Sequence, residues 1–252
     1  MMKKVKGGKQ FGKLFGTACG DFNIVNNEGV DHFLVPVDLD IPHQALLCWM
    51  QYKTTKVPKH FKLTAVHFYS TPEVNSKTNT HFSELCNKFN ITFISKKVEQ
   101  PANRTEYNQI LLETATENEC NKIAIPDSID YLNAFLLTNM ASGMFSGASI
   151  VQKMQLNDDK PEVLLTRPFC YATDKDIQKF GENMKYENEP TGIRLEEEPF
   201  METARKGISM LMSESTNVSR NFFKSQFTIQ KKYVGIGEDK VLLNPEDDID
   251  SL

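Results

Sequence analysis

Short apolar segments alternate with amphipathic segments along most of the chain, and this order constrains the fold more than any other feature. The alternation predicts strands at 33–37, 61–69, 91–94, 122–125 and 163–165, and helices at 44–52, 79–89, 105–117, 129–140 and 174–184. Strands that alternate with helices of about ten residues form right-handed crossovers, which build a parallel sheet covered on both faces. The sequence therefore predicts a doubly wound α/β fold with about five parallel strands.

Two further amphipathic segments flank this alternation. The spacing of apolar residues predicts a helical lead-in over 9–22 and a C-terminal helix over 200–212. A chain of 252 residues with 40% apolar content is long enough to bury one sizeable core, so a single domain over 1–235 is expected. The segment 236–252 carries six acids and one base and has little to bury, which predicts a flexible acidic tail. Pro36 fits poorly in a central strand because proline cannot donate a ladder hydrogen bond.

The charge pattern argues against a dedicated nucleic-acid binder. The formal net charge is −4, and the acidic tail accounts for it, so the rest of the chain is close to neutral. Local contact with a phosphate backbone remains open at the amino-terminal lysines, which are Lys3, Lys4, Lys6, Lys9 and Lys13.

Cysteine usage and hydropathy both indicate a cytoplasmic protein without a membrane anchor. The five cysteines are odd in number and scattered among apolar neighbours, a pattern typical of reduced core thiols. No apolar run approaches the roughly 18 residues that a membrane-spanning helix needs, and no secretory signal precedes the first helix.

Segments near the strand ends carry a resemblance to a known family. In order, they are Asp21–Val25, Asp31–Val37, Ala65–Val66, Leu111–Ile125, Phe135–Met140, and Arg167–Tyr171 continuing to Asp174–Ile177. This series resembles the tRNA 2-thiocytidine synthetases, a group of PP-loop ATPases in the adenine-nucleotide alpha-hydrolase-like superfamily. The resemblance extends from Lys13 to Pro190 and implies a Rossmann-like fold and a role in tRNA modification.

The phosphate-binding motif of that family is replaced in this sequence. The family motif is Ser-Gly-Gly-x-Asp-Ser, and the matching residues here are Asp38-Leu-Asp-Ile-Pro-His43. The glycines that let backbone N–H groups approach phosphate are gone, and a carboxylate near a phosphate costs on the order of several kcal/mol in a partly desolvated pocket. A magnesium ion between Asp38 or Asp40 and a phosphate would leave residual ATP binding open. The alternative is that both aspartates cap the following helix.

The other motifs implied by the resemblance are also changed. Where the family has Gly-His-His-x-Asp-Asp, residues 126–131 keep only Asp130 in place. The segments 99–104 and 189–194 lack the cysteines that hold the iron–sulfur cluster of thiolating members, so no cofactor is expected. Arg167, after the fifth strand, is expected to bind either phosphate or a buried carboxylate such as Asp176.

The sequence therefore predicts a degenerate relative that has lost ATP-dependent tRNA thiolation and acts as a binding, scaffolding or regulatory protein. Its vestigial nucleotide site comprises Asp38, Asp40, His43, Asp130 and Arg167, with no catalytic residue and no metal ligand assigned. The expected partners are a second copy or an active homologous subunit, with tRNA as a further candidate.

Two other functions stay open. One is an active ATP- or metal-dependent enzyme acting on tRNA, with a remodelled site in which Asp38, Asp40, His43 and Asp130 hold magnesium or manganese; this requires their side chains to converge within about 5 Å. The other is passive RNA binding through the amino-terminal lysines.

Overall fold

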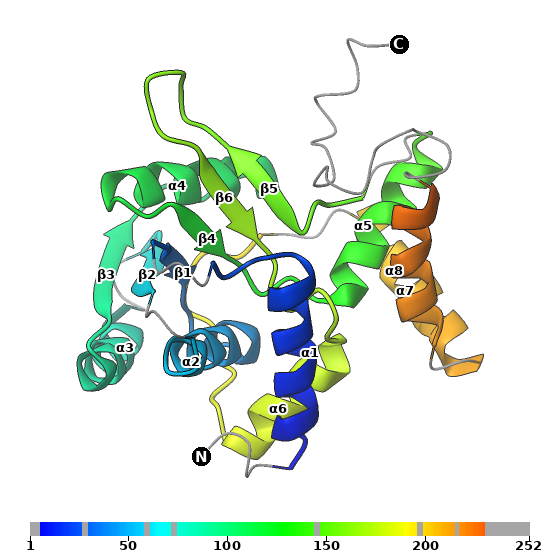
Figure 1. The fold of residues 1–252 in the computed structure, drawn as a ribbon, viewed down its shortest axis with the longest axis horizontal. Coiled ribbons are helices and arrows are strands. Elements are labelled where there is room, and N and C mark those ends of the chain that lie inside the picture. Colours follow the sequence, from blue (N-terminus) through cyan, green and yellow to red (C-terminus); the bar gives the residue numbers. More distant parts are fainter. Residues whose placement is uncertain are drawn as a thin grey trace.

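The computed structural model describes residues 6–26, 30–57, 61–71, 75–143, 147–195, 199–214 and 217–229. A six-stranded sheet in the order β3-β2-β1-β4-β6-β5 forms its centre (Figure 1). The strands are β1 (His32–Pro36), β2 (Lys62–Tyr69), β3 (Thr92–Lys97), β4 (Lys122–Ala124), β5 (Val151–Met154) and β6 (Val163–Thr166). All neighbouring strands pair in parallel except β5, which is antiparallel to β6. The predicted doubly wound α/β fold is confirmed.

Helices connect the strands and cover both faces of the sheet. They are α1 (Gly8–Asp21), α2 (Ile41–Thr54), α3 (Asn75–Phe89), α4 (Arg104–Glu117), α5 (Ile129–Ala141), α6 (Asp174–Met184), α7 (Pro199–Glu214) and α8 (Val218–Ile229). Helices α2 and α3 lie on one face, with α1 and α6 next to α2 on the side away from α3, and α4 lies on the other face (Figure 1). Helices α5, α7 and α8 form a separate layer beside β5 and β6.

The central strand β1 is apolar from Phe33 to Pro36 because both faces of this part are buried. Phe33 and Val35 belong to the core beneath α1, α2 and α6, whereas Leu34 belongs to the core beneath α4. Strands buried on both faces have near-continuous apolar sequences, which explains why this segment lacks the polar alternation of a half-exposed strand.

Pro36 is compatible with its central position. It is the last residue of β1, and the pairing of β1 with β4 involves Phe33 and Leu34 and ends before it. No β4 residue paired in this ladder therefore needs the backbone N–H that proline lacks.

The lead-in helix α1 packs through aromatic side chains. The ring of Phe11 stacks on Phe180 at 5.0 Å and meets the edge of Phe169 at the same distance, and Trp49 lies beside both Phe11 and Phe15. These contacts tie α1 to α2 and α6, so the segment predicted as a helical lead-in is part of the main core.

Two elements were not predicted from the sequence. Strand β5 has only four residues and lies at the sheet edge, with Val151 buried and the next three residues partly or fully exposed. Helix α8 packs on α5, where the Asn133 side chain donates to the Ser219 carbonyl at 2.8 Å. The predicted acidic tail at 236–252 lies outside the described residues, and the single domain over 1–235 remains a prediction. Among the helices described, none has the length and apolar character needed to cross a bilayer.

Candidate functional site

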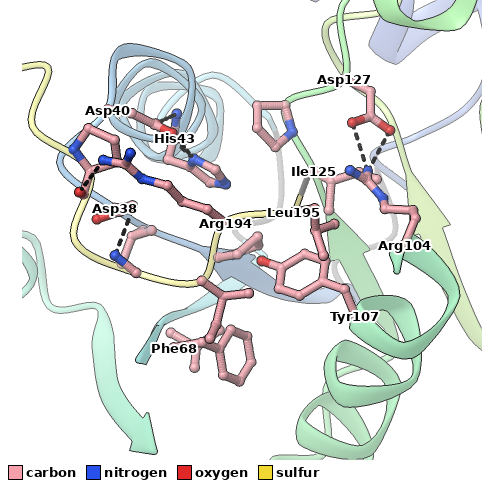
Figure 2. A pocket seen from close by; sticks show the side chains of 17 residues that line it. Asp38, Asp40, His43, Phe68, Arg104, Tyr107, Ile125, Asp127, Arg194 and Leu195 are labelled. Atoms are coloured by element: carbon pink, nitrogen blue, oxygen red, sulfur yellow. Dashed lines mark hydrogen bonds and ion pairs between the residues drawn. The ribbon is translucent and has the colours of Figure 1, made fainter. Parts of the chain in front are cut away.

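A cavity of about 430 Å³ lies at the carboxyl ends of β1, β2 and β4. The chain runs from β1 outward to β2 and β3 on one side and then returns to place β4 on the other side of β1. Such a reversal opens a crevice beyond the strand ends, and ligands of doubly wound proteins bind there. The walls of the cavity come from the residues after β1 and β4, from the start of α4, and from the segment 190–195 (Figure 2).

Asp38 follows β1, and both of its carboxylate oxygens accept hydrogen bonds from other residues of the protein. Its Oδ1 accepts from the Leu39 N–H at 2.8 Å and the Thr191 N–H at 2.9 Å, and its Oδ2 accepts from the Gly192 N–H at 3.0 Å. The Thr191 hydroxyl adds a contact of 3.2 Å. Asp38 thus holds the 190–195 segment across the ends of β1 and β2, where the Ile193 N–H donates to the Phe68 carbonyl.

Gly192 permits this close approach. A Cβ at this position would lie 2.8 Å from the Phe68 carbonyl oxygen and 3.2 Å from Asp38 Oδ2. A larger residue would therefore have to push the segment away from the sheet.

Asp40 caps α2 and orients His43. Its Oδ1 accepts from the His43 N–H at 2.9 Å, and both carboxylate oxygens lie within 2.8 Å of His43 Nδ1. Burial disfavours charge on both groups, but their mutual attraction outweighs it, so the pKa of His43 is raised and the pKa of Asp40 is lowered. Asp40 thus orients the His43 ring through Nδ1, and Nε2 is left for other contacts.

Asp127, after β4, is shared by two arginines. Arg104 Nη2, from the start of α4, donates to both of its oxygens at 2.8 and 2.9 Å, and Arg167 Nε donates to Oδ2 at 3.0 Å. Burial alone would raise the pKa of Asp127, but the two guanidinium groups hold it below its usual value. Arg167 also donates to the Ser149 carbonyl and is buried, whereas Arg104 lines the cavity.

Apolar side chains complete the cavity. Val66 and Phe68 come from β2, Ile125 follows β4, and Tyr107 projects from α4. The rings of Phe68 and Tyr107 meet edge to face at 6.1 Å. Figure 2 shows Tyr107, Phe68, Ile125 and Leu195 on the side of the cavity opposite Asp40.

The residues proposed from sequence are only partly brought together. Asp38, Asp40 and His43 line the cavity, and Arg167 lies behind its wall. Asp130 lies elsewhere: it accepts from the Asp174 N–H and the Ser219 hydroxyl, each at 2.8 Å, and links α5 to the starts of α6 and α8. The four donors of the proposed metal site therefore do not converge, and no group of three or more His, Cys, Asp or Glu able to hold a metal occurs within the described part of the chain.

Asp176, suggested from the sequence as the carboxylate that binds Arg167, is not its partner in the structure. Arg167 binds a buried carboxylate, but that carboxylate belongs to Asp127. Asp176 instead forms a capping box with Thr173 at the start of α6. A residue three positions into a helix is close to its own cap, and this local contact took precedence over a distant one.

The sequence did not reveal Arg104, Tyr107, Gly192 or Arg194 as cavity residues. One signal was available for Arg104: it begins a helix, although cations are disfavoured at helix amino termini. A cation in that position indicates a nearby anion, which here is Asp127.

Comparison with known proteins identifies the fold. The structure resembles the U34-tRNA thiolase NcsA from Methanococcus maripaludis with its [4Fe-4S] cluster, with a TM-score of 0.65 and 11% identity over 89% of this chain and 80% of that one. It also matches Candida glabrata FMN adenylyltransferase in complex with FMN and an ATP analogue, with a TM-score of 0.42 and 13% identity over 69% of this chain and 57% of that one. No protein-family model matches the sequence. The chain therefore shares the overall α/β fold of that thiolase.

The comparison contradicts the prediction that the protein has no cofactor, because the thiolase that shares its fold is described with a [4Fe-4S] cluster. That prediction is withdrawn. The described residues nevertheless do not fit such a cluster: the cavity lining contains no cysteine, and Cys19, Cys86, Cys120 and Cys170 are buried, with Cys48 partly so. No chemical step is therefore assigned to a cluster in this chain.

Proposed function

We propose that this protein is a tRNA-modification-related member of the PP-loop type that binds its ligand in the switch-point cavity and does not carry out ATP-dependent thiolation. The relation to tRNA modification is supported at the level of the fold by the thiolase likeness. The specific kinship to the 2-thiocytidine synthetases is carried by the sequence resemblance over 13–190.

One observation supports the proposed absence of thiolation activity. Four backbone N–H groups around the loop after β1, those of Leu39, His43, Thr191 and Gly192, donate to carboxylates of the chain itself. Such N–H groups are the donors with which a phosphate-binding loop holds a nucleotide. Because the carboxylates of Asp38 and Asp40 already accept from these N–H groups, a triphosphate would lose the donors and would also face like charge. The combined cost is on the order of several kcal/mol.

The rival function is an ATP- or metal-dependent enzyme acting on tRNA with a remodelled site. The Asp40–His43 pair is the arrangement that favours it, because a carboxylate on Nδ1 orients the imidazole for proton transfer through Nε2. The metal-dependent form required Asp130 as well, and Asp130 is committed to the α5–α6–α8 junction. We therefore place binding ahead of catalysis. The partners remain proposals: a second copy, an active homologous subunit, or tRNA.

A thiolation assay tests the proposal. Full-length protein would be incubated with unmodified tRNA, ATP, magnesium and a sulfur donor, both as purified and after anaerobic reconstitution with iron and sulfide. Pyrophosphate release and thiolated nucleosides would be measured, with an active tRNA thiolase of the same fold as the positive control. We expect no tRNA-dependent pyrophosphate release in either preparation. Release above the tRNA-free blank, accompanied by a thiolated nucleoside, would refute the proposal.

A further inference from the structure

The wall of the cavity formed by the loop after β4 carries an excess of positive charge. Arg104 and Arg167 share the single carboxylate of Asp127, so one guanidinium charge is left uncompensated. The side chains of Asp127 and Arg167 are only 7% and 5% exposed, whereas Arg104 is 32% exposed and lines the cavity. A charge largely removed from water is costly unless an opposite charge approaches it. The cavity is therefore suited to receive an anion next to Arg104.

Arg104 also has hydrogen-bonding capacity to spare. Its Nη2 binds Asp127, but its Nε is buried and has no hydrogen-bond partner among the residues that the structure describes. The guanidinium face lies 5.3 Å from the centre of the Tyr131 ring, which holds the side chain in place. A buried donor without an acceptor is rare in native proteins, so the chain itself does not fully satisfy this guanidinium.

His43 faces Arg104 across the cavity. The two side chains enter from opposite sides, one from the start of α2 and the other from the start of α4 (Figure 2). Asp40 holds Nδ1, and within the described residues Nε2 has no hydrogen-bond partner. His43 Nε2 and Arg104 are thus two donors on opposite walls of one cavity.

The remaining charged groups favour an anion near Arg104 and disfavour one at the loop after β1. Asp38 and Asp40 would repel an anion at that loop, although backbone N–H groups hold the first and His43 offsets the second. Arg194 adds a further cation, which lies on the Asp40 side and helps to lower the pKa of that carboxyl, whereas burial lowers the pKa of His67. The most favourable position for an anion is therefore displaced from the usual phosphate loop toward α4.

The apolar lining indicates the rest of the ligand. Phe68 and Tyr107 present aromatic surface, and Val66, Ile193 and Leu195 enclose the space beside them. A flat ring stacks or packs on such a surface, whereas a purely inorganic anion would leave it exposed to water.

We propose that the cavity binds a phosphate monoester of an aromatic or heterocyclic group, with the phosphate between His43 Nε2 and Arg104 and the ring against Tyr107 and Phe68. This inference rests on the proposed function, because it names the ligand class of the same cavity. The phosphate monoester has two sources in a tRNA-related protein, a free mononucleotide or the 5′-phosphorylated end of an RNA strand.

Calorimetric titration of the full-length protein tests the ligand class with four probes: 5′-AMP, phenyl phosphate, adenosine and inorganic phosphate. We expect 5′-AMP and phenyl phosphate to bind, and adenosine and inorganic phosphate to bind about tenfold more weakly, because each lacks one half of the recognition. Absence of binding by both phosphate monoesters would overturn the proposal.

Variants test the assigned position. His43→Gln and Arg104→Lys should each weaken phenyl phosphate binding about tenfold, the loss expected for one charge-assisted hydrogen bond. Lys77→Gln, an exposed lysine paired with Glu187 and Glu189 outside the cavity, is the matched control and should leave binding unchanged. If Arg104→Lys fails to fold, His43→Gln decides. Unchanged binding in that variant would place the phosphate elsewhere and refute the assignment.

A pair of RNA oligonucleotides distinguishes the two sources. If a 5′-phosphorylated oligonucleotide binds more tightly than 5′-AMP, and the same oligonucleotide with a 5′-hydroxyl does not, the ligand is an RNA end. Tighter binding of 5′-AMP than of both oligonucleotides would identify a free nucleotide. These readouts are independent of the thiolation assay, because a protein that thiolates tRNA can fail to bind phenyl phosphate and the reverse also holds.

Discussion

The loops after β1 and β4 lie beside each other at the same sheet edge, yet they satisfy their carboxylates in opposite ways. Asp38, after β1, is bound by neutral donors of the chain itself, and its loop is closed to a further anion. Asp127, after β4, is bound by two cations, and its loop keeps a positive charge that faces the cavity. A carboxylate at a strand end therefore does not identify the charge of a site, because its partners decide whether the surroundings repel or attract an anion.

Removal of the Asp127 charge is expected to have the largest effect. Asp127→Asn leaves the buried Arg167 and the partly exposed Arg104 without a counter-charge. Breaking a buried ion pair costs about 3–5 kcal/mol, and we expect a value near 3 kcal/mol because solvent reaches Arg104. Urea unfolding at neutral pH measures this loss.

The matched variant for that measurement is Lys77→Gln, which breaks the exposed ion pairs of Lys77 with Glu187 and Glu189. Its midpoint should equal that of the wild type. An Asp127→Asn protein as stable as Lys77→Gln would show that the two arginines find other partners, and the contrast between the two loops would be lost.

A methyl group at Gly192 is expected to have an intermediate effect on the closed loop. Gly192→Ala would place a Cβ 2.8 Å from the Phe68 carbonyl oxygen, so the 190–195 segment must move and its hydrogen bonds to Asp38 must lengthen. Overpacking of this kind costs about 1–3 kcal/mol, and thermal or urea unfolding measures it.

Gly16→Ala is the control for that substitution. Gly16 lies within α1 and has open space around its Cβ position, so alanine should leave stability unchanged or raise it by about 0.5–1 kcal/mol through helix propensity. Equal effects of the two substitutions would mean that the 190–195 segment is not held closely against the sheet.

The Asp40–His43 pair predicts a smaller, pH-dependent effect. Because the pKa of His43 is raised in the folded protein, its contribution to stability is complete below the ordinary pKa of 6.5 and is lost as the pH rises through the raised value. The pKa of Asp40 is lowered from 3.8, so its contribution is lost only as the pH falls through that lowered value. The pair should therefore stabilise the fold most between about pH 5 and 6.5, and lose on the order of 1 kcal/mol at higher pH.

Comparison of wild type with His43→Gln isolates this effect. Burial lowers the pKa of His32 and His67, so these two residues contribute the opposite slope. His43 adds to the lowering of the pKa of His67, so that part of the His67 slope is lost in the variant. The difference between the two urea-unfolding profiles should fall as the pH rises above 6.5. A constant difference across that range would contradict the assignment of charge to His43.

Sequence patterns predicted the strands and helices whose formation depends on residues close together in the chain. The five parallel strands and their crossover helices follow from hydrophobic periodicity, and the predicted helix 174–184 coincides with α6, whose start the structure shows to be fixed by a capping box of Thr173 and Asp176. Strand β5 was missed because four residues at an edge provide too little periodicity to detect. Asp130 was placed in the site by a motif match, although its hydrogen bonds lie with α6 and α8.

The sequence by itself determined the class of fold, the position of the crossover loops and the presence of two carboxylates, Asp38 and Asp40, in the loop after β1, because each depends on residues that are close in the chain. Only the tertiary structure decided the charge of the cavity. Asp38 meets Thr191 after 153 residues, and Asp127 meets Arg104 and Arg167 across 23 and 40 residues. Contacts over such separations are made when the sheet brings strand ends together, and no local pattern records which donor will reach which carboxylate.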